Sequence, residues 1–170
     1  KNSKRIPKRK EVIEEYGLPD YIIEGEEIQE KEKEWSSGLY SILRMSFGDK
    51  IDIRRSPRGR LVARAIGSFR DQITFVVVDG KPVIIQDYNL VEFIPPKEVI
   101  RFEVIEQIKT SSFNQLYLET FGRPKPPMVE PIGNVISIFT QSGKGLYAAL
   151  TDSKAIKTKE IPVFSLSKEY

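Results

Sequence analysis

Apolar and polar residues alternate between residues 43 and 54, with the two-residue period of a strand that has one buried face. Residues 43–47 and 51–54 each show this alternation, and Gly48-Asp49 between them supplies a turn. The pattern therefore predicts a hairpin. A second turn is predicted at Ser56–Gly59, where proline and glycine supply one restricted and one permissive backbone position.

The same kind of pattern predicts more short strands up to residue 95. The run Ile73–Val78 (ITFVVV) is β-branched and continuous, as in a central strand, and Asp79-Gly80 after it is a strong hairpin signal. Gly67 indicates a bend within the strand that precedes this run. The other strands of this region are predicted at 61–69, 83–85 and 90–94.

Residues 48–94 thus contain about five short strands joined by tight turns. This arrangement resembles the small SH3-like barrels, the shape that KOW, Tudor and Sm modules share. The resemblance rests on the spacing of the strands, and residues 65–68 match the KOW glycine context only loosely. It therefore implies an architecture and no particular family.

Two helices are predicted. Residues 11–16 favour a short helix that ends at Gly17-Leu18-Pro19, and residues 111–121 carry apolar side chains near helical spacing. Residues 24–34 are too acidic to bury much surface and indicate an exposed helix or a linker. Residues 1–10 have no apolar periodicity, which predicts an arm that is disordered until it binds.

The last third of the chain is predicted to be rich in strands. Residues 98–108 favour a strand, with a helix as the alternative, and residues 122–131 form a proline-rich loop. Residues 135–139 and 146–150 predict a hairpin around the turn Gln-Ser-Gly-Lys-Gly. Residues 161–166 predict a last strand, at a sheet edge because of Pro162.

The expected fold class is therefore mainly β with a small helical part. A chain of 170 residues usually forms one domain, or one domain with an appendage. We expect a basic arm with an acidic helix or linker at 1–34, and an SH3-like barrel or sandwich at 35–95 with its strands at about 40–95. A second β-rich portion follows at 96–170.

Composition narrows the possible chemistry. The chain has no cysteine and no histidine, which excludes disulfides, thiolate metal sites and Ser–His–Asp catalysis. Carboxylates and lysines remain as possible catalytic groups. No apolar run is long enough to span a membrane, and the basic start is not followed by the apolar stretch of a secretory signal, so we expect a cytoplasmic protein. Abundant Lys, Glu, Ile and Val favour a thermophilic origin, archaeal or viral.

Charge is sorted into blocks along the chain. Residues 1–10 hold six basic residues and no acid, residues 11–34 hold ten acids and two lysines, and residues 44–70 hold eight basic residues and two aspartates. A basic arm and a dense arginine patch are typical of proteins that bind a polyanion. The formal net charge of +3 conceals this separation.

The candidate nucleic-acid-binding residues come from the two basic blocks. Guanidinium groups pair bidentately with phosphates, and the arginines gather around the turn at Ser56–Gly59. Tyr40 is the candidate for base stacking, and Lys144 is an additional phosphate contact in a Ser-Gly-Lys-Gly sequence that we interpret as a plain hairpin turn between two strands. The basic candidates are Lys4, Arg5, Lys8, Arg9, Lys10, Arg54, Arg55, Arg58, Arg60 and Arg64.

These observations predict a non-catalytic nucleic-acid-binding or adaptor protein, such as a subunit of a nucleoprotein complex, with no cofactor and no metal. An acidic protein is the alternative partner. Two other functions stay open: a viral coat or assembly protein with a basic arm, and a metal-dependent nuclease built on aspartates such as Asp71 and Asp87.

Overall fold

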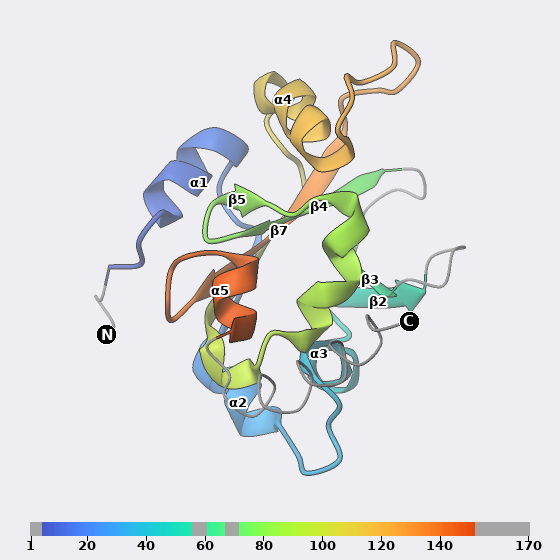
Figure 1. The fold of residues 1–170 in the computed structure, drawn as a ribbon. Helices are drawn as coiled ribbons and strands as arrows, with labels where there is room; N and C mark the ends of the chain where they lie inside the picture. Colours follow the sequence, from blue (N-terminus) through green and yellow to red (C-terminus); the bar gives the residue numbers. More distant parts are fainter. Residues whose placement is uncertain (1–4, 56–60, 67–71, 152–170) are drawn as a thin grey trace, which may run out of the picture.

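The computed structural model describes residues 5–55, 61–66 and 72–151 of the chain. Its main sheet has five strands in the order β1-β6-β7-β4-β5. Figure 1 labels β7, β4 and β5 of this sheet. The strands β4 and β7 run parallel, and the other neighbouring pairs of this sheet are antiparallel. The strand bounds are Tyr21–Glu24 for β1, Ile73–Val78 for β4, Lys81–Pro82 for β5, Val99–Ile105 for β6 and Gly133–Thr140 for β7. A separate antiparallel pair consists of β2 (Ile51–Arg55) and β3 (Leu61–Ala65).

Helices and the small strand pair cover both faces of the main sheet. One face packs against α1 (Arg9–Tyr16) and α4 (Thr110–Phe121). The opposite face packs against α2, α3, α5 and η1, together with β2 and β3. Their bounds are Gly25–Lys31 for α2, Leu39–Ser46 for α3, Leu146–Thr151 for α5, and Ile85–Phe93 and Pro96–Glu98 for the 3₁₀ helices η1 and η2.

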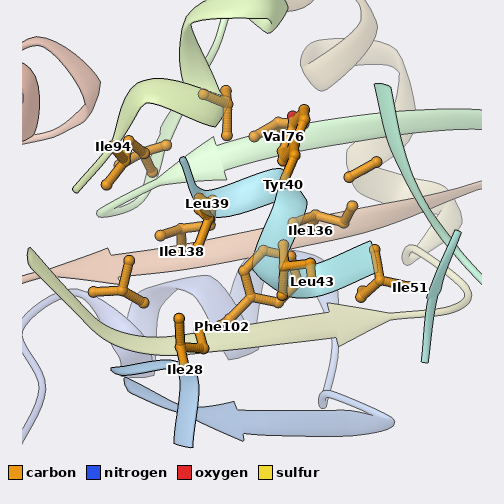
Figure 2. Close-up of a cluster of buried hydrophobic side chains, with 14 of the residues drawn as sticks. Ile28, Leu39, Tyr40, Leu43, Ile51, Val76, Ile94, Phe102, Ile136 and Ile138 are labelled. Carbon is orange, nitrogen blue, oxygen red and sulfur yellow. The ribbon is translucent and has the colours of Figure 1, made fainter. Parts of the chain in front are cut away.

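The larger core lies between the sheet and α3. Figure 2 shows Leu39, Tyr40 and Leu43 of α3 directed at side chains of β4, β6 and β7. Phe102 of β6 is fully buried in this cluster. The smaller core, on the other face, places Phe75 of β4 edge-on against Phe113 of α4, with ring centroids 5.4 Å apart. Each face of the sheet is therefore apolar, as a sheet covered on both sides requires.

Several predicted elements are confirmed. Strands occupy 51–55, 73–78 and 133–140, and the 98–108 segment is a strand, not the alternative helix. The 11–16 and 111–121 helices are present with slightly different ends, and residues 122–131 form a loop. Asp79 and Gly80 have φ values of 52° and 81°, so both adopt the left-handed conformation of a type I′ hairpin turn between β4 and β5.

The strand predicted at 43–47 is wrong, because this segment belongs to helix α3. Gly38 begins the helix, and its φ of 93° favours glycine. The buried residues Leu39, Tyr40, Ile42 and Leu43 follow helical spacing. This apolar helix face is longer than the alternating pattern of residues 43–47, so the segment packs as a helix. The predicted hairpin around Gly48-Asp49 is therefore a connection from α3 to β2.

Three other predicted strands are also wrong. Residues 83–85 and 90–94 belong mostly to η1 and its ends, where Tyr88 and Val91 are buried three residues apart. Residues 146–150 belong to α5, where Leu146 and Ala149 are buried at the same spacing. Short apolar segments fit a helical or a strand period equally well, so the elements they pack against determine which conformation they adopt.

The fold is mixed α and β and not mainly β. The strands predicted for an SH3-like barrel separate into two sheets, and no closed barrel forms among the described residues. The main sheet takes β1 from the 1–34 range, β4 and β5 from 35–95, and β6 and β7 from 96–170. The turn at Ser56–Gly59, the bend at Gly67 and the strand at 161–166 lie outside the described residues.

The described part of the N-terminal arm is packed on the sheet, contrary to the prediction of disorder. Ile6 packs against the smaller core, and Arg9 Nε donates to Glu103 Oε2 at 2.5 Å. Glu103 is fully buried in β6, and Arg101 Nη1 lies 3.7 Å from the same oxygen. The arm is ordered because a buried carboxylate requires a cation, and Arg9 supplies it.

Replacing Arg9 with Ala is expected to lower the free energy of unfolding by about 3 kcal/mol, the low end for removing one partner of a buried ion pair. Glu103 would keep only the more distant Arg101. Urea unfolding of Arg9→Ala checks this. The exposed neighbour Lys10 is the control, and Lys10→Ala should change the free energy by less than about 0.5 kcal/mol. Equal losses in the two variants would contradict the assignment.

Candidate functional site

Two turns meet where the parallel strands β4 and β7 end. The Asp79-Gly80 turn follows β4, and the loop at residues 141–145 follows β7 and leads into α5. The pairing of Val78 with Ile138 places these two ends side by side. Ligands of α/β proteins bind beyond the carboxyl ends of parallel strands, because the chain leaves the sheet there and the loops diverge. This edge is therefore the first place to look for a site.

The buried carboxylate of Asp79 holds the two turns together. Its side chain accepts from the Thr140 backbone N–H at 2.9 Å, from the Thr140 hydroxyl at 2.5 Å and from the Gly145 N–H at 2.8 Å. Asp79 is only 2% exposed, so these three donors satisfy a charge that water does not reach. The carboxylate holds the 141–145 loop in place and is not accessible to a ligand.

Three exposed lysines from distant parts of the sequence lie around these turns. Lys81 Nζ donates to the Lys144 carbonyl at 3.4 Å. The Lys8 side chain lies against Gly80, where an added Cβ would stand 3.4 Å from Lys8 Cβ. Figure 1 shows the start of α1, the β4–β5 turn and the loop before α5 on the same side of the molecule. We call Lys8, Lys81 and Lys144 the lysine cluster.

Two glycines with left-handed backbone conformations lie against lysine side chains of the cluster. Gly145 has a φ of +105°, and an added Cβ would stand 3.4 Å from Lys81 Cδ. Gly80, with a φ of +81°, makes the corresponding contact with Lys8. A residue with a side chain would be strained in its backbone at either position, whereas its Cβ would meet the lysine only at ordinary van der Waals distance. The glycines are therefore required by the backbone conformation of the two turns that carry the lysine cluster.

An exposed aromatic residue follows Lys144 of the lysine cluster closely in the chain. Tyr147, in α5, is 60% exposed and comes three residues after Lys144. Its hydroxyl donates to a carboxylate oxygen of Asp87 in η1. This hydrogen bond is the largest cause of the raised pKa of Tyr147, and partial burial is the second.

The predicted basic site residues do not all lie on one surface in the structure. Lys8 and Lys144 belong to the lysine cluster, while Arg5 and Lys10 are exposed on or beside α1. Arg9 is paired with Glu103 and serves the docking of α1. Lys4, Arg58 and Arg60 lie outside the described residues.

The arginine surface is partly paired within its own sheet. Arg54 forms an ion pair with Asp52, its neighbour on the same face of β2. Arg64 of β3 is opposite Asp52 in the register, so the aspartate lies between two arginines. Arg55 ends β2. An acid between Arg54 and Arg64 lowers the positive potential that the arginine-rich sequence suggests.

Tyr40 is not a stacking residue, which corrects the prediction. It is 2% exposed in α3 and packs in the larger core, and this burial raises its pKa. The Ser-Gly-Lys-Gly sequence is also different from the prediction, because it joins a strand to a helix and not two strands. The sequence analysis does not predict Lys81 and Tyr147 as site residues. The Asp-Gly-Lys hairpin sequence signals Lys81 locally, but no local pattern places either residue beside Lys144.

The aspartates considered for a nuclease do not gather in the part of the chain that is described. Across residues 5–55, 61–66 and 72–151, no three His, Cys, Asp or Glu side chains are grouped as metal ligands would be. Asp79 and Asp87 have the hydrogen bonds given above, and Asp71 lies outside the described residues.

Comparisons with protein-family models, with curated proteins and with solved structures give no match. Among the described helices, none has the length and apolar character that crossing a membrane requires.

Asp79→Asn is expected to lower the free energy of unfolding by about 2 kcal/mol, because an amide group facing three donors leaves at least one buried N–H unpaired. The Gly145 amide should exchange with deuterium faster, since the loop loses its anchor. Urea unfolding and amide exchange measure the two effects. Thr140→Val is the matched control, because it removes one of the three bonds and should cost about 1 kcal/mol. Unchanged exchange at Gly145 in Asp79→Asn would contradict the anchoring role.

Proposed function

We propose that this protein binds nucleic acid without catalysing a reaction on it, through the surface around the lysine cluster. The observation that carries the proposal is the meeting of Lys8, Lys81 and Lys144 at two glycine-containing turns. The three side chains are exposed, whereas Asp79 beneath them is buried and fully bonded. The charge presented to solvent by this group of residues is therefore positive.

Phosphate is the chemical group that suits such a surface. Lysine ammonium groups are compact charges that attract phosphate without a fixed geometry, so they favour binding that is independent of sequence. Each neutralised phosphate releases counterions, which makes the affinity fall as salt rises. Arg5 and Lys10, at the start of α1, would extend the positive surface from the lysine cluster.

The arginines around β2 and β3 have a secondary place in the proposal. Arg54 remains 64% exposed despite its ion pair with Asp52, so a phosphate could compete with the aspartate for it. Bidentate arginine contacts would then strengthen binding. The two surfaces make separate contributions that variants can distinguish. An acidic protein remains the alternative partner, and it would compete for the same lysines.

The triple variant Lys8→Gln, Lys81→Gln, Lys144→Gln is expected to bind oligonucleotides at least tenfold more weakly at low salt. Its slope of log affinity against log salt should be shallower by about 2, because a single strand contributes about 0.7 for each phosphate contact. Fluorescence anisotropy with labelled single- and double-stranded DNA and RNA at several salt concentrations measures both quantities.

The control for net charge is the triple variant Lys31→Gln, Lys33→Gln, Arg123→Gln, which removes three exposed charges from the end of α2 and the loop after α4. It should retain most of the affinity and the salt slope of the wild type. A second series replaces Arg54, Arg55, Arg58, Arg60 and Arg64 with Gln to measure the arginine contribution. Equal losses of affinity in the two triple variants would mean that binding depends only on net charge, and would reject the lysine cluster as the site.

A further inference from the structure

The ring of Tyr147 is fixed at both ends. Its backbone belongs to α5, where the Ala149 N–H donates to the Gly145 carbonyl at 3.1 Å. Its hydroxyl reaches across to the Asp87 carboxylate in η1. A tyrosine side chain has only two rotatable angles, so these two attachments leave little conformational freedom to lose on binding. A ring that is both exposed and fixed is suited to contact a flat ligand.

The position of Tyr147 relative to the lysine cluster is what distinguishes it from other exposed aromatic residues. Gly145, two residues before it, contacts the Lys81 side chain, and Lys144 precedes that glycine. Two residues span at most about 7 Å, so the Tyr147 backbone lies within that distance of Gly145, which lies against Lys81 and follows Lys144. Trp35 is 64% exposed as well, but it lies on the connection from α2 to α3. Single exposed apolar residues are common, and exposure alone would mean little.

Positive charge beside an aromatic ring is the combination that binds single-stranded nucleic acid. The charges bind the phosphates, and the ring stacks on the face of a base. That face is accessible only where the strand is unpaired. In a duplex the faces of the bases are covered by their neighbours. Like any phenol of ordinary pKa, the tyrosine is neutral at neutral pH, so the phenol itself does not repel phosphate.

We propose that Tyr147 stacks on an unpaired base of a single strand whose phosphates contact Lys81 and Lys144, and that the protein therefore prefers single-stranded to double-stranded nucleic acid. This inference rests on the proposed function and specifies its ligand. Asp87 is a positioning residue in this arrangement, since it holds the ring through the tyrosine hydroxyl.

The test compares strands that differ only in their bases. Labelled oligo(dT) and oligo(U) of roughly 12 nucleotides, within the site sizes of single-strand binders, are titrated beside an abasic strand of equal length and a blunt duplex. Tyr147→Ala should weaken binding of oligo(dT) or oligo(U) by about tenfold, in the range reported for loss of one stacked base. Binding of the abasic strand should stay within about twofold, because the phosphate contacts remain.

Matched variants separate stacking from other effects of the substitution. Tyr147→Phe keeps the ring and loses the bond to Asp87, so it should lose part of the base-dependent affinity, less than Tyr147→Ala loses, because the ring can still stack but is no longer fixed. Trp35→Ala removes an aromatic side chain of similar exposure elsewhere and should leave all affinities unchanged. The lysine-cluster triple variant should weaken the abasic strand and the normal strands alike. Thermal unfolding of each variant shows whether the fold is retained.

The outcomes distinguish the inference from the function on which it rests. Equal losses for oligo(dT) and the abasic strand in Tyr147→Ala would assign the tyrosine a structural role and overturn the inference. An unchanged affinity of Tyr147→Ala for every strand, or a wild type that prefers the duplex, would also overturn it while leaving the lysine cluster in place. A wild type that binds none of these strands at low salt would reject the proposed function itself.

Discussion

The parallel pairing of β4 with β7 is the constraint on which the rest of the site depends. The two strands run side by side from Ile73 opposite Gly133 to Val78 opposite Ile138, and β7 continues to Thr140 beside the turn that follows β4. Asp79 and Thr140, 61 residues apart, then meet directly. Because the Asp79 side chain accepts three hydrogen bonds, the β4–β5 turn and the loop before α5 are held as one unit. Without this pairing, Lys81 and Lys144 would have no reason to be neighbours.

The second constraint is the buried carboxylate of Glu103. A buried ion pair adds little net stability compared with apolar residues of the same size, but it is costly to leave unpaired. Glu103 therefore selects the position in which Arg9 reaches it, and α1 docks on the sheet in that position. One residue before Arg9, Lys8 contacts Gly80 and completes the lysine cluster. A charge inside the protein thus determines where a charge on its surface lies.

The proposed binding surface combines groups with different physical roles. The lysines provide attraction that acts at a distance and is screened by salt. Tyr147 provides a short-range contact that needs an accessible base, and its anchor on Asp87 reduces the entropy lost on binding. By contrast, the arginines of β2 and β3 have Asp52 among them, which offsets part of their charge. The density of arginine in the sequence is thus a poor measure of the positive potential in the fold.

The sequence by itself determined the features that depend on neighbouring residues. The Asp79-Gly80 turn, the β-branched strand before it and the helix at 110–121 follow from local conformational preference and periodicity. The charge blocks and the absence of histidine and cysteine are also direct properties of the chain. The tertiary structure decided that residues 39–46 and 146–151 are helices, because short apolar segments take the period that their packing partners require. It alone placed Lys8, Lys81, Lys144 and Tyr147 around one edge of the sheet, since strand pairing and a buried ion pair act between residues that are far apart in the chain.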